Sequence, residues 1–183
     1  MSNKSQQQSN GCGCLLGLIT FGLIIATILP SFLSSAGKAK QSEAKQYVGS
    51  MNRAQQAYFL DNNTFTNDIP KLGLGIKTET NYYRYSTSAA KETVFNYGIA
   101  RSDVYKTEYI LFIPIKRKQQ LKSYIGGVFQ VPATQVEANA RKNEMTTVAI
   151  LCETNSPSTS KPPQPTYKNG VLACGEGTRD LSK

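Results

Sequence analysis

The sequence predicts an α+β protein in which one long N-terminal helix packs against an antiparallel β-sheet. Two observations lead to this prediction. A helical pattern continues from residue 15 to about residue 62, and short strand-like runs follow between residues 82 and 153. The second half of the helix carries a single apolar stripe, and the inner face of the sheet is its natural partner.

The first half of the helix is an uncharged apolar stretch from Leu15 to Leu33. Roughly 20 apolar residues span the hydrocarbon core of a bilayer, so a transmembrane helix is predicted over residues 15–36. Pro30 lies inside this stretch and should kink the helix, because it removes a backbone donor. The anchor residues are Leu15, Leu16, Leu18, Ile19, Phe21, Leu23, Ile24, Ile25, Ile28, Leu29, Phe32 and Leu33.

The regions on either side of this anchor differ in composition. Residues 1–14 begin with a polar stretch of low complexity and are expected to form a disordered cytoplasmic N-terminus. Residues 37–183 are expected to form one globular domain. Cys12 and Cys14 lie just before the anchor and leave several readings open: a lipid modification, an intermolecular disulfide, a metal site, or two small residues at the membrane edge.

A cleaved secretory signal is the alternative to a permanent anchor. Ser34-Ser35-Ala36 has the small side chains of a signal-peptidase site. The helical pattern continues across these residues, which favours the anchor. A lipoprotein signal fits less well, because its cysteine follows the apolar core, whereas both N-terminal cysteines precede it.

From Lys38 the helix becomes amphipathic and water-exposed, and it is expected to end near Asp61–Asn63. Its apolar residues recur at steps of three and four, the spacing that places side chains on one helix face. The predicted stripe consists of Ala44, Tyr47, Val48, Met51, Ala54 and Tyr58.

Five strands are expected, over residues 82–86, 93–101, 108–114, 124–132 and 146–153. Alternation places Phe95, Tyr97 and Ile99 on one face of the second strand, and Ile125, Phe129 and Val131 on one face of the fourth. Gly126-Gly127 predicts a β-bulge in that fourth strand. Residues 155–166 are rich in Pro and Ser and should form an extended surface loop.

Cys152 and Cys174 lie near the C-terminus, on either side of this loop. A disulfide between them would close a segment of about 20 residues and stabilise the fold by roughly 3 kcal/mol in the chain-entropy model. Such a bridge persists only in an oxidising compartment. Two free buried thiols are the alternative.

The composition favours binding over catalysis. Histidine is absent, which removes the commonest general base and imidazole ligand. The chain has no Gly-x-Ser-x-Gly motif, phosphate loop or carboxylate cluster, so neither an enzyme, a cofactor nor a metal is expected. The net charge of +9 favours anionic partners, although its even spread also fits an ordinary solvated surface.

One dense basic run consists of Lys116, Arg117 and Lys118, with Lys122 and Tyr124 close by. Such a group can contact phosphates, and aromatic side chains can stack on bases. A run between two apolar strands is more often a solvated hairpin loop. Nucleic acid is therefore retained only as an alternative partner.

Three segments resemble the type IV pilins, and in particular the type IV pilin-like G and H family found in cyanobacteria. They are residues 28–60, which resemble the N-terminal pilin helix, residues 80–86 (Thr-Asn-Tyr-Tyr-Arg-Tyr-Ser) and residues 146–153 (Thr-Thr-Val-Ala-Ile-Leu-Cys-Glu). The resemblance implies a pilin fold: an S-shaped helix, an antiparallel sheet of four or more strands, and a C-terminal loop closed by a disulfide.

The resemblance also implies a non-catalytic role in a pilus or a secretion-type pseudopilus. Pilins are stored in the membrane and polymerise through their apolar helices, and they serve motility, DNA uptake, adhesion or secretion. The implied partners are the lipid bilayer and other pilin-like subunits or a membrane protein complex. The N-terminus is expected in the cytoplasm, with the globular domain in the periplasm, the thylakoid lumen or outside the cell.

The sequence departs from pilins at the prepilin cleavage motif. Alignment on Pro30 places the expected glycine at Gln8 and the expected glutamate at Gly13. In pilins that glutamate is a costly charge within the bilayer unless it pairs with the amine of a neighbouring subunit. Its absence predicts an unprocessed, single-pass membrane protein, so an orphan that binds an envelope or membrane complex is an alternative to a pilus subunit.

Overall fold

The computed structural model describes residues 11–110 and 113–182, with side chains from Gly37 onward except those of Tyr109 and Ile110. Helix α1 (Gly11–Asn62) is continuous. The chain divides into two compact units, one ending at Ala39 and the other comprising Lys40–Lys183, here called the head.

The N-terminal predictions fall largely outside this description. Residues 1–10 of the expected disordered segment lie outside the described residues, as do the side chains of Cys12, Cys14, the predicted anchor and Pro30. Among the described residues, no helix combines the length and the apolar character of a membrane span.

In the head, α1 is held by the stripe of side chains that it buries. Ala44, Val48 and Met51 are fully buried, as their spacing predicts. Beyond Met51 the predicted stripe is wrong, because Ala54 and Tyr58 are only half-buried. The buried positions there are Asn52, Gln55 and Phe59.

Polar side chains enter this part of the core because their amides are hydrogen-bonded. Asn52 Nδ2 donates to the Ile150 carbonyl at 2.9 Å, and Gln55 Nε2 donates to the Thr66 carbonyl at 2.7 Å. A buried amide costs little when it is paired in this way. The helix ends at Asn62, as predicted, and the left-handed Asn63 closes it with an N–H bond to the Phe59 carbonyl.

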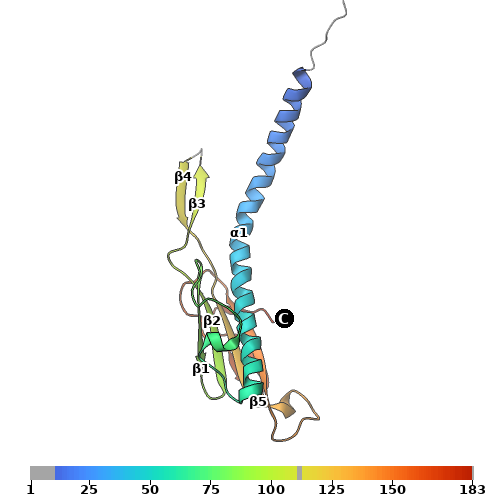
Figure 1. The fold of residues 1–183 in the computed structure, drawn as a ribbon, viewed down its shortest axis with the longest axis vertical. Coiled ribbons are helices and arrows are strands. Elements are labelled where there is room, and N and C mark those ends of the chain that lie inside the picture. Colours follow the sequence, from blue (N-terminus) through green and yellow to red (C-terminus); the bar gives the residue numbers. More distant parts are fainter. Residues whose placement is uncertain (1–10, 111–112, 183) are drawn as a thin grey trace, which may run out of the picture. The chain divides into compact units, whose positions relative to one another are not determined.

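The helix packs on a five-stranded, fully antiparallel sheet (Figure 1). The strands are β1 (Tyr83–Ala89), β2 (Thr93–Ala100), β5 (Tyr124–Pro132), β6 (Met145–Thr154) and β9 (Thr178–Asp180), in the order β1-β2-β5-β6-β9. Four of these strands confirm the predicted runs. Strand β9 was not predicted, because three residues are too few to show an alternating pattern.

The prediction of a single strand over residues 108–114 is wrong. This stretch belongs to two strands, β3 (Tyr105–Ile110) and β4 (Ile113–Lys118), which form a separate two-stranded sheet. The uncharged run between Glu108 and Lys116 contains no glycine or asparagine to mark a turn, so its change of direction was not visible in the pattern.

A second small hairpin was also missed. Strands β7 (Thr166–Lys168) and β8 (Val171–Ala173) are joined by Asn169 and Gly170, which both have positive φ. Asn-Gly is a strong hairpin-turn signal, so the cue was present in the sequence. Two short 3-10 helices, η1 (Ile69–Leu72) and η2 (Ala133–Gln135), complete the described elements.

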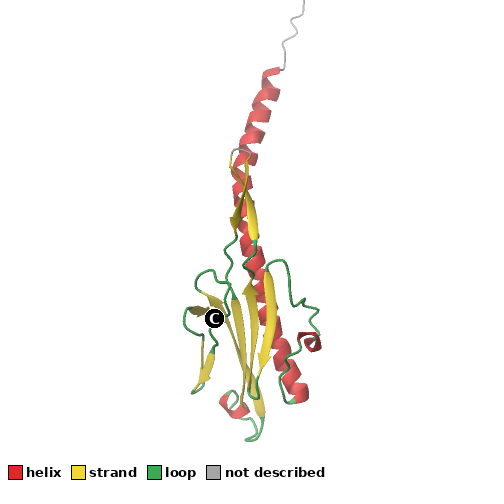
Figure 2. Cartoon of the chain, turned by 90° about the vertical axis from the view of Figure 1, so that its left-hand side faces the viewer, coloured by secondary structure: helices red, strands yellow, loops and turns green. Residues whose placement is uncertain are grey.

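The sheet has a different cover on each face, and Figure 2 shows its strands in front of the helix. The helix packs on the face that carries Tyr83, Tyr85 and Tyr124. The opposite face carries the two predicted sets of alternating residues, each on one face of its strand as predicted, and the two sets pack together. That face is covered by the C-terminal segment, from which Tyr167, Leu172 and Cys174 contribute.

The predicted bulge at Gly126-Gly127 is wrong, because β5 pairs with β2 and β6 in an unbroken register. The two glycines instead permit close approach from both sides. A Cβ at Gly126 would overlap the Asn52 amide of the helix, and a Cβ at Gly127 would lie 2.7 Å from Pro165 Cγ. The glycine pair is therefore explained by packing.

Candidate interaction surface

The four basic residues singled out in the sequence do not form one patch. Lys116, Arg117 and Lys118 lie on strand β4, not in the solvated loop expected for them. Lys122 lies between β4 and β5, and its Nζ is 3.0 Å from Glu153 Oε2. Because side chains alternate along a strand, Arg117 lies on the opposite face of β4 from Lys116 and Lys118.

One face of the β3–β4 hairpin is internally neutralised. Arg117 lies opposite Lys106 in the ladder, and both pair with Glu108, at 2.9 Å and 2.6 Å respectively. The hydrogen bond from Lys106, together with both positive charges, holds the pKa of Glu108 below its ordinary value. This face therefore presents little unpaired charge.

The other face of the hairpin is basic and aromatic. Tyr105 lies opposite Lys118, and Thr107 lies opposite Lys116, so these four residues share one face. No carboxylate pairs with either lysine among the residues that the structure describes. Tyr105 is 59% exposed, which leaves its ring accessible beside the two ammonium groups.

The base of this hairpin is attached to the N-terminal end of the head. The Gln119 N–H donates to the Val104 carbonyl at 2.8 Å and closes the base. Lys40 Nζ, on α1, donates to Gln119 Oε1 at 2.8 Å and lies 3.9 Å from the centre of the Tyr82 ring. The hairpin therefore starts from a defined position beside Lys40.

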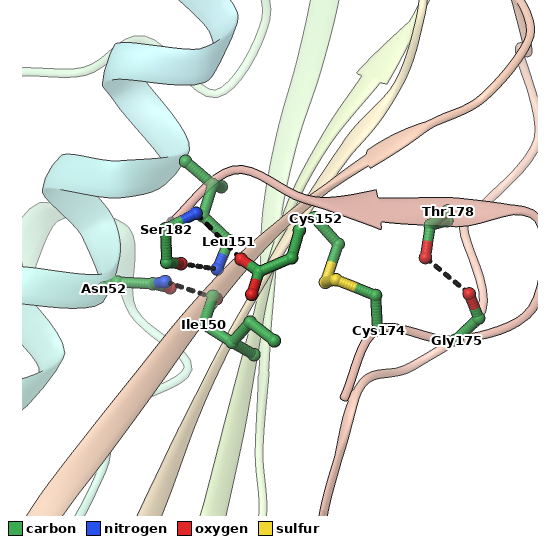
Figure 3. Close-up of a disulfide and its surroundings, with 9 residues drawn as sticks. Asn52, Ile150, Leu151, Cys152, Cys174, Gly175, Thr178 and Ser182 are labelled. Atoms are coloured by element: carbon green, nitrogen blue, oxygen red, sulfur yellow. Dashed lines mark hydrogen bonds between the residues drawn. A yellow bond between two sulfur atoms is a disulfide. The ribbon is translucent and has the colours of Figure 1, made fainter. Parts of the chain in front are cut away.

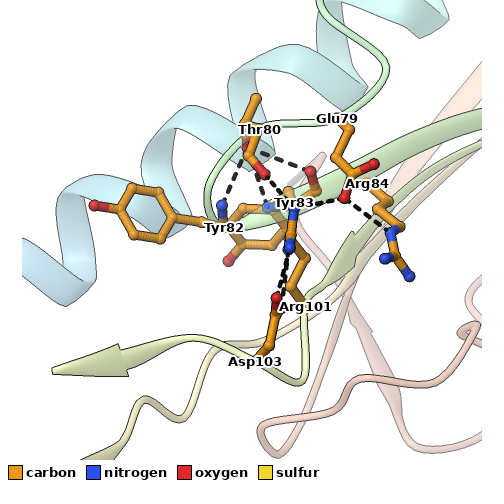
Figure 4. Close-up of polar contacts among 7 residues, drawn as sticks. All are labelled: Glu79, Thr80, Tyr82, Tyr83, Arg84, Arg101 and Asp103. Carbon is orange, nitrogen blue, oxygen red and sulfur yellow. Dashed lines mark hydrogen bonds and ion pairs between the residues drawn. The ribbon is translucent and has the colours of Figure 1, made fainter. Parts of the chain in front are cut away.

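Charged contacts also hold the turn that leads from β2 into this hairpin (Figure 4). The Arg101 guanidinium donates to both Asp103 and Glu79, and Arg84 Nε lies 3.3 Å from the same Glu79 carboxylate. The hydrogen bond from Arg101 lowers the pKa of Asp103 to about 2. The turn therefore stays ion-paired across the neutral pH range.

Glu153 joins three strands of the large sheet. Its carboxylate accepts hydrogen bonds from Lys122 Nζ at 3.0 Å, the Tyr124 hydroxyl at 3.1 Å and Arg179 Nε at 2.7 Å. Burial raises the pKa of Glu153, but these three donors outweigh burial and leave the pKa below its ordinary value of 4.5. The Lys122 ammonium group is therefore engaged in an ion pair within the head.

We expect this carboxylate to make the head acid-sensitive. Because its pKa is lower in the folded state, Glu153 stabilises the fold above pH 4.5, and this contribution is lost as the pH falls through the folded-state pKa. Between pH 7 and pH 3, the free energy of unfolding measured with denaturant should fall less for Glu153→Gln than for the unmodified chain. The exposed Glu137, which has no ion pair in the described structure, supplies the control Glu137→Gln. An equal fall in the free energy of unfolding for all three chains would contradict this role of Glu153.

The disulfide expected from the sequence is present between Cys152 on β6 and Cys174, which follows β8 (Figure 3). It joins residues 22 positions apart and holds the C-terminal segment against the sheet. The chain end is held to the same strand, because the Leu151 N–H donates to Ser182 Oγ at 3.0 Å. The expected extended loop over residues 155–166 spans irregular backbone that leads into β7.

The described head buries several tyrosines and contains cavities of moderate size. Burial raises the pKa of the Tyr83, Tyr85 and Tyr124 phenols, which therefore stay protonated at neutral pH. No group of three His, Cys, Asp or Glu side chains that could hold a metal occurs among the described residues. One cavity of about 380 Å³ lies between α1 and β6, and another of about 370 Å³ lies at the base of the hairpin.

Comparison with known proteins adds one finding to this geometry. Residues 41–175 match the family model described as type IV pilin-like G and H. The matched range includes α1 from residue 41 onward, strands β1 to β8 and both cysteines of the disulfide. The searches of curated proteins and of solved structures return no match.

Proposed function

Since the chain belongs to the type IV pilin-like G and H family, we propose that it is a membrane-anchored, non-catalytic subunit or accessory of a type IV pilus or pseudopilus machine. The family match over the head is the observation that carries this proposal. It is supported by the way α1 buries one stripe on an antiparallel sheet, and by the continuity of that helix with the uncharged stretch from Leu15 to Leu33.

We further propose that the N-terminus is cytoplasmic and that the head lies in an oxidising compartment, such as the periplasm or the thylakoid lumen. The disulfide between Cys152 and Cys174 supports this orientation, because cytosolic thiols are kept reduced. The lipid bilayer and other pilin-like subunits are the proposed partners.

A second candidate is an unprocessed protein that stays in the membrane and binds an envelope complex through its head. Gln8 and Gly13, at the positions of the pilin cleavage glycine and the pilin glutamate, favour it. Without a carboxylate in the apolar helix, neither the cost of burying it nor its pairing with a neighbouring subunit arises. A DNA-binding minor pilin is less well supported, because Arg117 and Lys122 are held in ion pairs.

Anchoring is tested by placing charge in the predicted span. Ile24→Arg combined with Ile25→Arg should move the chain out of the membrane fraction, since each arginine at a helix centre costs about 2.5–3.5 kcal/mol on insertion scales. Leu60→Arg is the matched control, because Leu60 is an apolar residue of the same helix that is 69% exposed. Carbonate-washed membranes and immunoblotting measure the distribution. Release of the unmodified chain by the wash would contradict anchoring.

Recovery in sheared filaments separates the two candidates. A pilus or pseudopilus subunit should appear in the sheared fraction, whereas an orphan should stay in the membrane. Mass analysis of the N-terminal peptide complements this assay. A mature N-terminus within residues 9–14 would show that the chain is processed after all and would remove the second candidate.

A further inference from the structure

We propose that the β3–β4 hairpin docks on the anionic surface of the bilayer that holds the chain. The hairpin surface consists of Tyr105, Pro114, Lys116 and Lys118 on the basic face, together with Ile113, the first residue of β4, which lies next to Pro114 and alternates to the other face. This inference rests on the proposed anchoring and deepens it, because it gives the head a second and reversible contact with the membrane.

The first argument is the exposure of the hairpin. Its two strands form a sheet of their own, and five of the six residues of β4 are exposed. A lone two-stranded hairpin is at best marginally stable in water. This one also exposes Ile113, at 63%, and Tyr105, at 59%. Apolar and aromatic side chains on an uncovered element are typical of a surface that meets a partner.

The second argument is the distribution of charge. Glu108 is the only carboxylate between residues 105 and 118, and it is already paired with Lys106 and Arg117. On the opposite face, Lys116 and Lys118 have no acidic neighbour among the described residues. Tyr105 and Pro114 share the face of these lysines, and the exposed Ile113 lies next to Pro114 at the start of β4. At a bilayer interface the apolar and aromatic groups enter the acyl boundary, and the ammonium groups meet lipid phosphates.

The third argument is reach. The hairpin base is hydrogen-bonded to Lys40, which lies seven residues after Leu33, the last apolar residue of the predicted span over residues 15–36; seven residues extend about 10 Å along a helix. A six-residue strand extends about 20 Å. The hairpin projects from the head at this base in both views (Figures 1 and 2). Along the chain, the separation between the hairpin base and the predicted span is therefore shorter than the hairpin itself.

The same observations favour lipid over nucleic acid. Phosphates of a nucleic acid would use the two lysines but would leave Ile113 and Pro114 in water. A bilayer interface accommodates both the apolar and the basic side chains. Neither residue is required by the core of the head, since both are exposed.

The test uses the full chain reconstituted into vesicles. The sequence has no tryptophan, so Ile113→Trp introduces a single reporter at the hairpin. Val171→Trp is the matched control, because Val171 is 64% exposed and Ile113 is 63% exposed. In vesicles of phosphatidylcholine and phosphatidylglycerol, the emission of Ile113→Trp should shift to shorter wavelength and be quenched by lipids with brominated chains. The emission of Val171→Trp should do neither.

Charge reversal tests the basic part of the surface. Adding Lys116→Glu and Lys118→Glu to Ile113→Trp should reduce the equilibrium constant for docking by at least about tenfold. Lys91→Glu with Lys142→Glu makes the same change in charge at exposed positions elsewhere in the head and should leave docking unchanged. Vesicles of phosphatidylcholine alone should give weaker quenching than the anionic mixture.

The outcomes separate this inference from the proposed anchoring. A chain that floats with vesicles while Ile113→Trp stays unquenched overturns docking and leaves anchoring intact. A chain that does not float overturns both. A spectral shift of Ile113→Trp on addition of duplex DNA, with no response to anionic lipid, overturns the lipid assignment in favour of nucleic acid.

Discussion

Removal of the Cys152–Cys174 disulfide should lower the free energy of unfolding of the head by about 3 kcal/mol. The bridge joins residues 22 positions apart, and releasing such a loop enlarges the unfolded ensemble. Its loss also frees the C-terminal segment that covers Tyr97, Ile125 and Phe129. We therefore expect cleavage by proteases to begin within residues 155–175.

The measurement compares the oxidised chain, the reduced chain and the Cys152→Ala/Cys174→Ala variant by denaturant unfolding in detergent. Tyrosine fluorescence reports the head alone, because all ten tyrosines follow Gln46. Cys12→Ser with Cys14→Ser is the matched control, since it removes the two other thiols and should leave the transition unchanged. Identical unfolding midpoints before and after reduction would show that the bridge does not stabilise the head.

Gly126→Ala should destabilise the head by about 3 kcal/mol, from overpacking and from broken buried hydrogen bonds together. The new methyl group would overlap the Asn52 amide, which lies between the helix and the sheet. To make room, Asn52 would lose its bond to the Ile150 carbonyl at 2.9 Å and the one that it accepts from Asn96 at 3.0 Å. Asn52 and Asn96 are both buried, so water cannot replace these hydrogen bonds without a large free-energy cost.

Two further variants show whether Asn52 is the cause. In an Asn52→Ala background, Gly126→Ala should cost much less, which a double-mutant cycle measures as a coupling energy. Gly49→Ala is the control on the same helix, because its Cβ would meet Leu151 at an ordinary 3.7 Å. That substitution should stabilise the helix by up to about 1 kcal/mol. Strict additivity of the Asn52 and Gly126 substitutions would contradict the proposed clash.

In the helix, local sequence pattern predicts some of the buried positions but not all of them. The positions of Ala44, Val48 and Met51 follow from a repeat of three and four, which depends only on helix geometry. This repeat does not predict that Asn52 and Gln55 are buried while Ala54 and Tyr58 are only half-buried. Amides have no apolar signature, and their burial depends on partners far along the chain, such as the Ile150 carbonyl.

The candidate surface shows the same division. The basic residues and their apolar neighbours are visible in the sequence, but their grouping is not. The register of the hairpin brings Arg117 into an ion pair with Glu108. Lys122 pairs with Glu153, which is distant in the sequence. Within the described structure, these two pairings leave Lys116 and Lys118 as the lysines of one exposed face that have no acidic partner.

By itself, the sequence determined the α+β class, the extent of the helix, four of the sheet's strands and the likeness to pilin-like G and H proteins. These depend on short-range periodicity and on local composition. The tertiary structure alone decided that β3 and β4 form a separate two-stranded sheet, that the glycine pair of β5 serves close packing, and which of the described lysines of β4 lack an ion pair. Each of these depends on contacts between residues distant in sequence, which hydrophobic periodicity does not encode.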